Sequence, residues 1–243
     1  MPRPMPLPTL VLLVRHGMTP TTGRVLPGRA PGLHLADTGR AQAESLAERL
    51  AAWALAPVRG ARTSRSRPAN RSGRIAAVYS SPLERTRETA APIAHSLDLP
   101  VKVERGLLEC DYGDWTGAEL KTLRKLPEWA TVQRTPSSFR FPDGESMVGM
   151  QARMVETVRT LCARHPGGVV VAVSHADPIK ATVAHALGAH LDLFQRIVIT
   201  PCSLTAISYD SGAPSVLTVN ATGSLNELLP AIRPPRPASS RRP

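Results

Sequence analysis

The sequence predicts an α/β fold, a three-layer αβα sandwich around a mostly parallel central sheet. Three short apolar segments, 10–14, 75–79 and 169–173, have the length and composition of buried strands. Helical periodicity recurs between them, and strands that alternate with helices are typical of a parallel sheet covered on both faces. A chain of 243 residues can bury one such core, so we expect a single domain.

The N-terminal half supplies two of these strands. The first, 10–14, ends at Arg15-His16-Gly17, and we expect Thr38 to cap a helix that continues to about Leu55. The second, 75–79, leads through a Ser-Ser-Pro turn into a helix that ends near Leu97. A short extended segment, 101–103, follows.

The C-terminal half begins with a loop-rich section in which we expect one helix between Gly117 and Leu126. Ser146 is a suitable cap for a long helix with one apolar stripe, formed by Met147, Met150, Met154, Val158 and Leu161. Core packing explains that stripe best. The strand 169–173 ends in Ser174-His175, a helix is expected from about Pro178 to Leu187, and segments 204–209 and 216–219 form a predicted hairpin.

The formal charge of +11 is unevenly distributed. Ten arginines lie in segments 58–74 and 231–243, neither of which contains an acid, so the rest of the chain is nearly neutral. Both segments are too poor in branched apolar residues to order themselves. We therefore expect one domain, 8–230, interrupted by a disordered basic insertion at 58–74 and followed by a disordered tail at 231–243.

Composition also bears on location and partners. Cys110, Cys162 and Cys202 form no CxxC pair, which fits a reducing cytoplasm, and no apolar stretch approaches the roughly 20 residues of a membrane span. The apolar run 10–14 is too short for a signal peptide. We expect a cytoplasmic protein with no membrane partner, and its oligomeric state stays open.

Metal ions and cofactors are not expected. The residues that could act as ligands lie at scattered spacings with no HExxH or paired His/Asp motif; they are His34, Asp37, His185, His190 and Asp192.

Polar residues follow three of the predicted strands at the point where each strand ends. Arg15 and His16 follow the first, Arg85 comes shortly after the second, and His175 follows the third. Open parallel sheets bind ligands in the crevice at the carboxyl ends of their strands. Because arginine contacts phosphate oxygens two at a time, this combination predicts a pocket for a phosphate dianion.

Five motifs together resemble the histidine phosphatase superfamily, also called phosphoglycerate mutase-like. They are Arg15-His16-Gly17, the run Ser81 to Thr89, the run Leu107 to Gly117, Gly144-Glu145-Ser146, and Ser174-His175. They occur in the family's order and extend over about residues 10–225. The resemblance extends to the Gly28–Gly32 turn and the Asn220 end of actinobacterial members of phosphomutase or phosphatase type. It implies a phosphoglycerate mutase-like fold.

The resemblance also implies roles for individual residues. His16 would accept the phosphoryl group, Arg15, Arg85 and His175 would hold its oxygens, and Glu109 would act as general acid and base. Two departures concern phosphate binding: Thr22 lies where the family has Asn, and Ala176 replaces a glycine whose amide contacts phosphate. Asp177 replaces a second glycine. We interpret it as a helix N-cap, with a role in binding a positive substrate group as the alternative.

These observations predict a phosphatase that acts on a small phosphorylated metabolite. A phosphomutase of the phosphoglycerate mutase type remains an alternative, since only the acceptor of the phosphoryl group differs. A different class of function would be nucleic acid or acidic-partner binding by the 58–74 segment. That segment has no aromatic residue to stack on bases, so we do not expect nucleic acid as the main partner.

Overall fold

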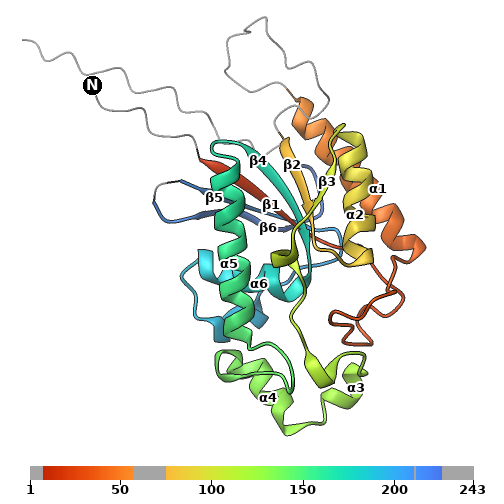
Figure 1. Ribbon diagram of the computed structural model, residues 1–243, viewed down its shortest axis with the longest axis vertical. Helices are drawn as coiled ribbons and strands as arrows, with labels where there is room; N and C mark the ends of the chain where they lie inside the picture. The colour runs from red at the N-terminus through yellow and green to blue at the C-terminus, as the bar shows by residue number, and fades with distance from the viewer. Residues whose placement is uncertain (1–7, 57–74, 211, 226–243) are drawn as a thin grey trace, which may run out of the picture.

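A six-stranded mixed sheet forms the centre of the protein (Figure 1). The strands lie in the order β3-β2-β4-β1-β5-β6. Strands β1 to β4 are parallel to one another, β5 is antiparallel to β1, and β6 is antiparallel to β5. Their bounds are β1 Thr9–Arg15, β2 Ile75–Ser80, β3 Val101–Val103, β4 Val169–Ser174, β5 Leu204–Tyr209 and β6 Ser215–Ala221. The predicted α/β class, the mostly parallel sheet and the terminal β5–β6 hairpin are confirmed.

The computed structural model describes residues 8–56, 75–210 and 212–225. The predicted basic insertion at 58–74 and the predicted tail at 231–243 lie outside the described residues.

Helices cover both faces of the sheet (Figure 1). On one face lie α1 (Asp37–Leu55) and α2 (Glu84–Ser96), and on the other lie α5 (Met147–Arg164) and α6 (Ala176–Ala186). The shorter α3 (Leu120–Leu123) and α4 (Pro127–Arg134) lie together at the lower end of the view. Four 3₁₀ turns complete the described elements: η1 Arg105–Leu107, η2 Gly113–Trp115, η3 Pro136–Ser138 and η4 Leu191–Arg196.

Alternation along β1 produces the layers. Leu10, Leu12 and Val14 point into the core under α1 and α2, whereas Val11 and Leu13 point into the core under α5 and α6. A strand whose two faces are both buried must be apolar throughout, which explains its continuous apolar run.

A third apolar cluster holds the loop-rich section 110–141 against the first turn of α5. Its aromatic members include Tyr112, Trp115, Phe139, Phe141 and Phe194. Trp115 packs on Phe139 and Phe141 with ring centroids 5.5 and 5.4 Å apart, within the range of favourable aromatic pairs. This cluster fixes a section that has little regular secondary structure of its own.

The predicted cap of α5 is confirmed, because the Ser146 hydroxyl accepts a hydrogen bond from the amide of Gly149 at 3.0 Å. The methionine stripe below it is buried in the core, as expected. The capped helix thereby connects the sheet to the third cluster.

One local prediction is wrong, and another is incomplete. Thr38 does not cap α1, because Ala36 holds the cap position and its amide donates to the carbonyl of Met18. Gly39, in the first turn of α1, lies so close to the Met18 backbone that a Cβ atom there would clash with it. The helix expected between Gly117 and Leu126 is present as the one-turn α3, whereas α4, which follows it, was not predicted.

No helix within the described parts of the chain combines the length and the apolar character needed to cross a bilayer.

Candidate active site

Neighbouring parallel strands bring the predicted site residues to one end of the sheet. β1 pairs with β4 so that Arg15 lies opposite Ser174, and β2 pairs with β4 so that Ser80 lies opposite Val173. The residues that follow these strand ends therefore converge although they are far apart in sequence.

His16 is held in one tautomer. Its ring is 6% exposed, and Nδ1 lies 2.7 Å from the carbonyl oxygen of Gly17. Because a carbonyl can only accept, Nδ1 must donate, and in the neutral ring Nε2 keeps its lone pair. Burial and then the charges of Arg85 and Arg15 lower the pKa of His16 to about 3. The imidazole is thus neutral and nucleophilic at physiological pH.

The two arginines carry donors that no described protein group accepts. Arg15 donates through Nη1 to the carbonyl of Ile199, and Arg85 donates through Nη2 to the carbonyl of Gly28, each at 2.7 Å. Among the described residues, none accepts from Nε of Arg15 or from Nε and Nη1 of Arg85, although all three atoms are buried. Each buried unpaired donor costs about 1–3 kcal/mol, so these groups favour an anionic ligand.

His175 lies beside His16, with ring centroids 5.2 Å apart. Its Nε2 is 2.9 Å from the Ser81 hydroxyl, whereas its buried Nδ1 has no hydrogen-bond partner among the described residues. Burial, followed by the charge of Arg85, holds the pKa of His175 well below its usual value. A neutral His175 that accepts from Ser81 through Nε2 presents its Nδ1–H as one more donor for an anion.

Glu109 supplies a carboxyl group that retains its proton near neutral pH. The residue is 7% exposed, and one oxygen accepts from the amide of Cys110 at 2.9 Å. Burial first, and then the charge of Asp177, raise the pKa of Glu109 to about 7 against the opposing effects of Arg85 and Arg15. Such a group can exchange a proton with a substrate at physiological pH.

One cavity of about 350 Å³ joins these groups. Five of the predicted residues line it: Arg15, His16, Thr22, Glu109 and Ala176. Arg85 and His175 have no exposed surface and lie close to His16. All seven predicted site residues are therefore brought together.

The two departures from the family pattern fit this cavity differently. The Thr22 hydroxyl accepts from the amide of Thr19 at 2.9 Å and also contacts the Thr19 hydroxyl, so it stabilises its own loop. Ala176 is the first residue of α6, directly after its N-cap, His175. It is not among the positive-φ residues, so an alanine is accommodated and its amide belongs to the helix N-terminus.

The interpretation of Asp177 as a helix N-cap is wrong. His175 is the N-cap, because α6 begins at Ala176, and Asp177 lies in the first turn. Its carboxylate accepts from the Tyr112 hydroxyl at 2.9 Å and lies 3.5 Å from the ammonium of Lys180. The side chain lines the cavity instead of capping the helix.

Sequence reasoning missed a network of charged groups behind Glu109. Arg29 donates through Nε to the carbonyl of Glu109 and through Nη2 to Glu145, and Arg153 makes two hydrogen bonds of 2.8 Å to the same Glu145. Arg153 also donates to the carbonyls of Gly106 and Leu108. Burial acts to raise the pKa of Glu145, but Arg153 and Arg29 outweigh it and hold that pKa below its usual value.

This network fixes the backbone on both sides of Glu109. The Gly28–Gly32 turn and the Gly144-Glu145-Ser146 motif were the available sequence signals, but neither indicated which loop they would hold. The network explains why these two motifs accompany the acidic residue.

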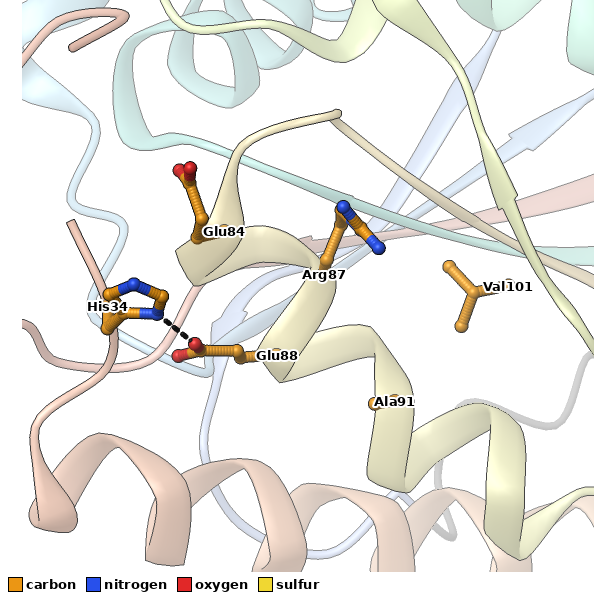
Figure 2. A pocket seen from close by; sticks show the side chains of 6 residues that line it. All are labelled: His34, Glu84, Arg87, Glu88, Ala91 and Val101. Atoms are coloured by element: carbon orange, nitrogen blue, oxygen red, sulfur yellow. Dashed lines mark hydrogen bonds and ion pairs between the residues drawn. The ribbon is translucent and has the colours of Figure 1, made fainter. Parts of the chain in front are cut away.

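A second cavity, of about 420 Å³, lies against α2 away from this site (Figure 2). His34 and Glu88 point toward one another and form a short contact, and Glu88 also accepts from the amide of Leu35. Glu84 accepts from the amide of Gly32. These acids attach the 32–35 segment to α2, so their charges have a structural explanation.

In the described parts of the chain, no three His, Cys, Asp or Glu side chains are arranged to hold a metal ion.

Comparison with known families agrees with this geometry. The family model described as histidine phosphatase superfamily (branch 1) matches residues 11–71 and 58–222. The chain belongs to the histidine phosphatase superfamily. This confirms the resemblance on which the residue roles were predicted.

Relatives within the histidine phosphatase superfamily include a bifunctional protein of Mycobacterium tuberculosis, 34% identical over 222 residues. That match covers 90% of this chain and 55% of the relative, so the chain spans about half of that protein's length. Phosphoserine phosphatase 1 of Hydrogenobacter thermophilus is 32% identical over 152 residues, which cover 62% of this chain and 72% of the relative.

A solved phosphoserine phosphatase mutant of Entamoeba histolytica, in complex with phosphoserine, has the same fold. It superposes with a TM-score of 0.73 at 22% identity and covers 88% of this chain and 98% of that chain. The similarity supports the phosphoglycerate mutase-like architecture.

The charged network behind Glu109 leads to a stability prediction. Glu145→Gln should lower the free energy of unfolding by about 1–3 kcal/mol, because Arg29 and Arg153 lose a charged partner in a half-buried setting. Denaturant unfolding measures the difference. Asp114→Asn, on an exposed residue of the adjoining loop, is the matched control and should change stability by less than about 0.5 kcal/mol. Equal stability of the two variants would contradict the structural role of the network.

Proposed function

We propose that the protein is a phosphatase that hydrolyses a small phosphate monoester through a phosphohistidine formed on His16. The observation that carries this proposal is the set of buried donors around the neutral imidazole. Nε of Arg15, Nε and Nη1 of Arg85, and Nδ1 of His175 have no acceptor among the described residues. A phosphoryl group offers the several oxygens that such a set requires.

The first half of the reaction transfers the phosphoryl group to the enzyme. Nε2 of His16 attacks phosphorus while the bond from phosphorus to the ester oxygen breaks. Glu109 gives its proton to that departing oxygen, and the alcohol leaves. Arg15, Arg85 and His175 hold the non-bridging oxygens and offset the charge that develops on them.

The second half regenerates the enzyme. Ionised Glu109 takes a proton from water, whose oxygen attacks phosphorus as the bond to Nε2 breaks. Inorganic phosphate leaves, and Glu109 is again protonated. The hydrogen bond from Nδ1 to Gly17 stabilises the ring while it carries the phosphoryl group, because that ring is then positively charged.

The dimensions of the cavity and the relatives support a small substrate. A volume of about 350 Å³ is at the small end of ligand pockets in proteins. One relative is named a phosphoserine phosphatase. Cytoplasmic location is part of this proposal and is supported by three cysteines that are all free, as expected in a reducing compartment.

Removal of the nucleophile tests the proposal. His16→Ala should lower the release of inorganic phosphate from 4-nitrophenyl phosphate by about 10³-fold or more, because it removes the proposed acceptor of the phosphoryl group. His34→Ala, at an exposed histidine outside the site, is the control and should retain wild-type activity. Near-normal turnover by His16→Ala would refute the mechanism. Phosphoryl transfer to a sugar acid without phosphate release would indicate a mutase instead.

The raised pKa of Glu109 predicts the pH dependence. The carboxyl group is protonated below its pKa of about 7, so kcat/KM for an alkyl phosphate should fall as the pH rises through that value. Glu109→Gln should lose about 10²–10⁴-fold at pH 6 and lack this fall. With 4-nitrophenyl phosphate the loss should be smaller, since nitrophenolate leaves with little help from an acid. An unchanged pH profile in Glu109→Gln would show that another group titrates.

A further inference from the structure

One wall of the active-site cavity carries a pair of opposite charges that the proposed reaction does not use. Asp177 and Lys180 lie one turn apart on α6, with Oδ1 and Nζ separated by 3.5 Å. Their side chains are only 20% and 17% exposed, and both line the cavity that contains His16. Such a pair differs from an ordinary surface ion pair, which is largely solvated.

Neighbouring residues hold both groups in position. The Tyr112 hydroxyl donates to Oδ2 of Asp177 at 2.9 Å. Lys180 donates to the side-chain carbonyl of Gln195 at 3.1 Å and lies 5.6 Å from the ring centre of Phe194. Because these contacts leave further lone pairs on the carboxylate and further N–H groups on the ammonium, a ligand can still reach each charge.

The acid is unfavourable for phosphate binding alone. A carboxylate in the lining of the cavity repels a phosphate dianion and competes for Arg15, which it attracts. The next residue toward the N-terminus is Ala176, at the start of α6 where an anion is favoured. An acid in this place is advantageous if the substrate brings a positive charge close to its phosphate.

Much of the remaining lining of the cavity is apolar. It includes Val25, Leu26, Pro27, Leu120 and residues 197–199. Charged groups of a substrate other than its phosphate therefore find partners mainly at Asp177 and Lys180.

We propose that Asp177 and Lys180 form a subsite for the zwitterionic head group of an O-phosphorylated α-amino acid. Asp177 binds the ammonium and Lys180 binds the carboxylate. These two ligand groups share one carbon atom, so their separation is similar to the 3.5 Å between the two side chains. When the ligand binds beside the two side chains, its ammonium lies next to the Asp177 carboxylate and its carboxylate lies next to the Lys180 ammonium.

The proposal also includes the length of the substrate. Ala176 and Asp177 are consecutive residues at the start of α6, and both line the cavity. We therefore expect a short linker between a phosphate bound at the helix N-terminus and an ammonium bound at Asp177, such as the single methylene of a phosphorylated hydroxy amino acid. This inference rests on the proposed phosphatase function.

Four substrates separate the contributions of the two charges. O-phosphoserine has both charged groups, O-phosphoethanolamine has only the ammonium, 3-phosphoglycerate has only the carboxylate, and glycerol 3-phosphate, an alkyl phosphate like the other three, has neither. Values of kcat/KM are compared at pH 6, where Glu109 is protonated, and each is divided by the value for glycerol 3-phosphate in the same variant. This ratio removes effects that a variant has on phosphate binding or on Glu109.

Asp177→Asn should lower the normalised value about tenfold or more for O-phosphoserine and O-phosphoethanolamine, and not for 3-phosphoglycerate. Lys180→Met should lower it for O-phosphoserine and 3-phosphoglycerate, and not for O-phosphoethanolamine. Asp114→Asn and Lys121→Met remove the same charges at exposed positions and should change none of the ratios. Equal effects of each subsite variant on all four substrates would overturn the inference.

Failure of the subsite and failure of the proposed function give different results. Wild-type turnover of 4-nitrophenyl phosphate without preference for O-phosphoserine over glycerol 3-phosphate leaves the phosphatase and refutes the subsite. If no substrate is turned over, calorimetric titration of the wild-type protein with O-phosphoserine decides the subsite alone. Binding that weakens in both Asp177→Asn and Lys180→Met supports it, whereas unchanged or absent binding refutes it.

Discussion

The guanidinium of Arg85 has no exposed surface, and its burial at the end of a parallel sheet constrains everything around it. A buried charge is costly unless it is paired and hydrogen-bonded, yet the guanidinium of Arg85 makes one hydrogen bond among the described residues, to the Gly28 carbonyl. Its charge lowers the pKa of His16 and His175 in addition to the effect of burial, which keeps both rings neutral. The buried charge of Arg85 thus favours binding of an anion and keeps the imidazole of His16 neutral, as the proposed phosphoryl transfer requires.

Different parts of the fold position the phosphate-binding residues and the acidic residue Glu109. Parallel strands β1, β2 and β4 bring Arg15, His16, Arg85 and His175 to one edge of the sheet, where rigid backbone fixes their positions. The acidic group comes instead from the irregular section that the aromatic cluster and α5 hold in place. Since Arg29 and Arg153 both donate to the Glu109 carbonyl and share Glu145, that section is fixed by charge-assisted hydrogen bonds in place of a strand.

The strand-end residues could be predicted from sequence because short continuous apolar runs indicate buried strands, and parallel pairing brings the carboxyl ends of such strands to the same end of the sheet. The capping role of Ser146 could be predicted because it depends on residues within one helical turn. The place of Asp177 in the cavity lining could not be predicted, because the direction of its side chain depends on the Tyr112 hydroxyl, 65 residues away in sequence. Thr38 is a residue type that often caps helices, but Ala36, whose amide donates to the Met18 carbonyl, occupies the cap position of α1. Tertiary contacts decide such positions, and a single sequence does not record them.

The most direct test of this account is the site of phosphorylation. Rapid acid-free denaturation of the enzyme during turnover, followed by ³¹P NMR and peptide mapping, identifies both the residue and the ring nitrogen that carry phosphate. Because Nδ1 of His16 donates to the Gly17 carbonyl, the phosphoryl group should be on Nε2 of His16. Phosphate on Nδ1, on His175 or on another residue, or no phosphoenzyme under conditions where its breakdown is slow, would contradict the account.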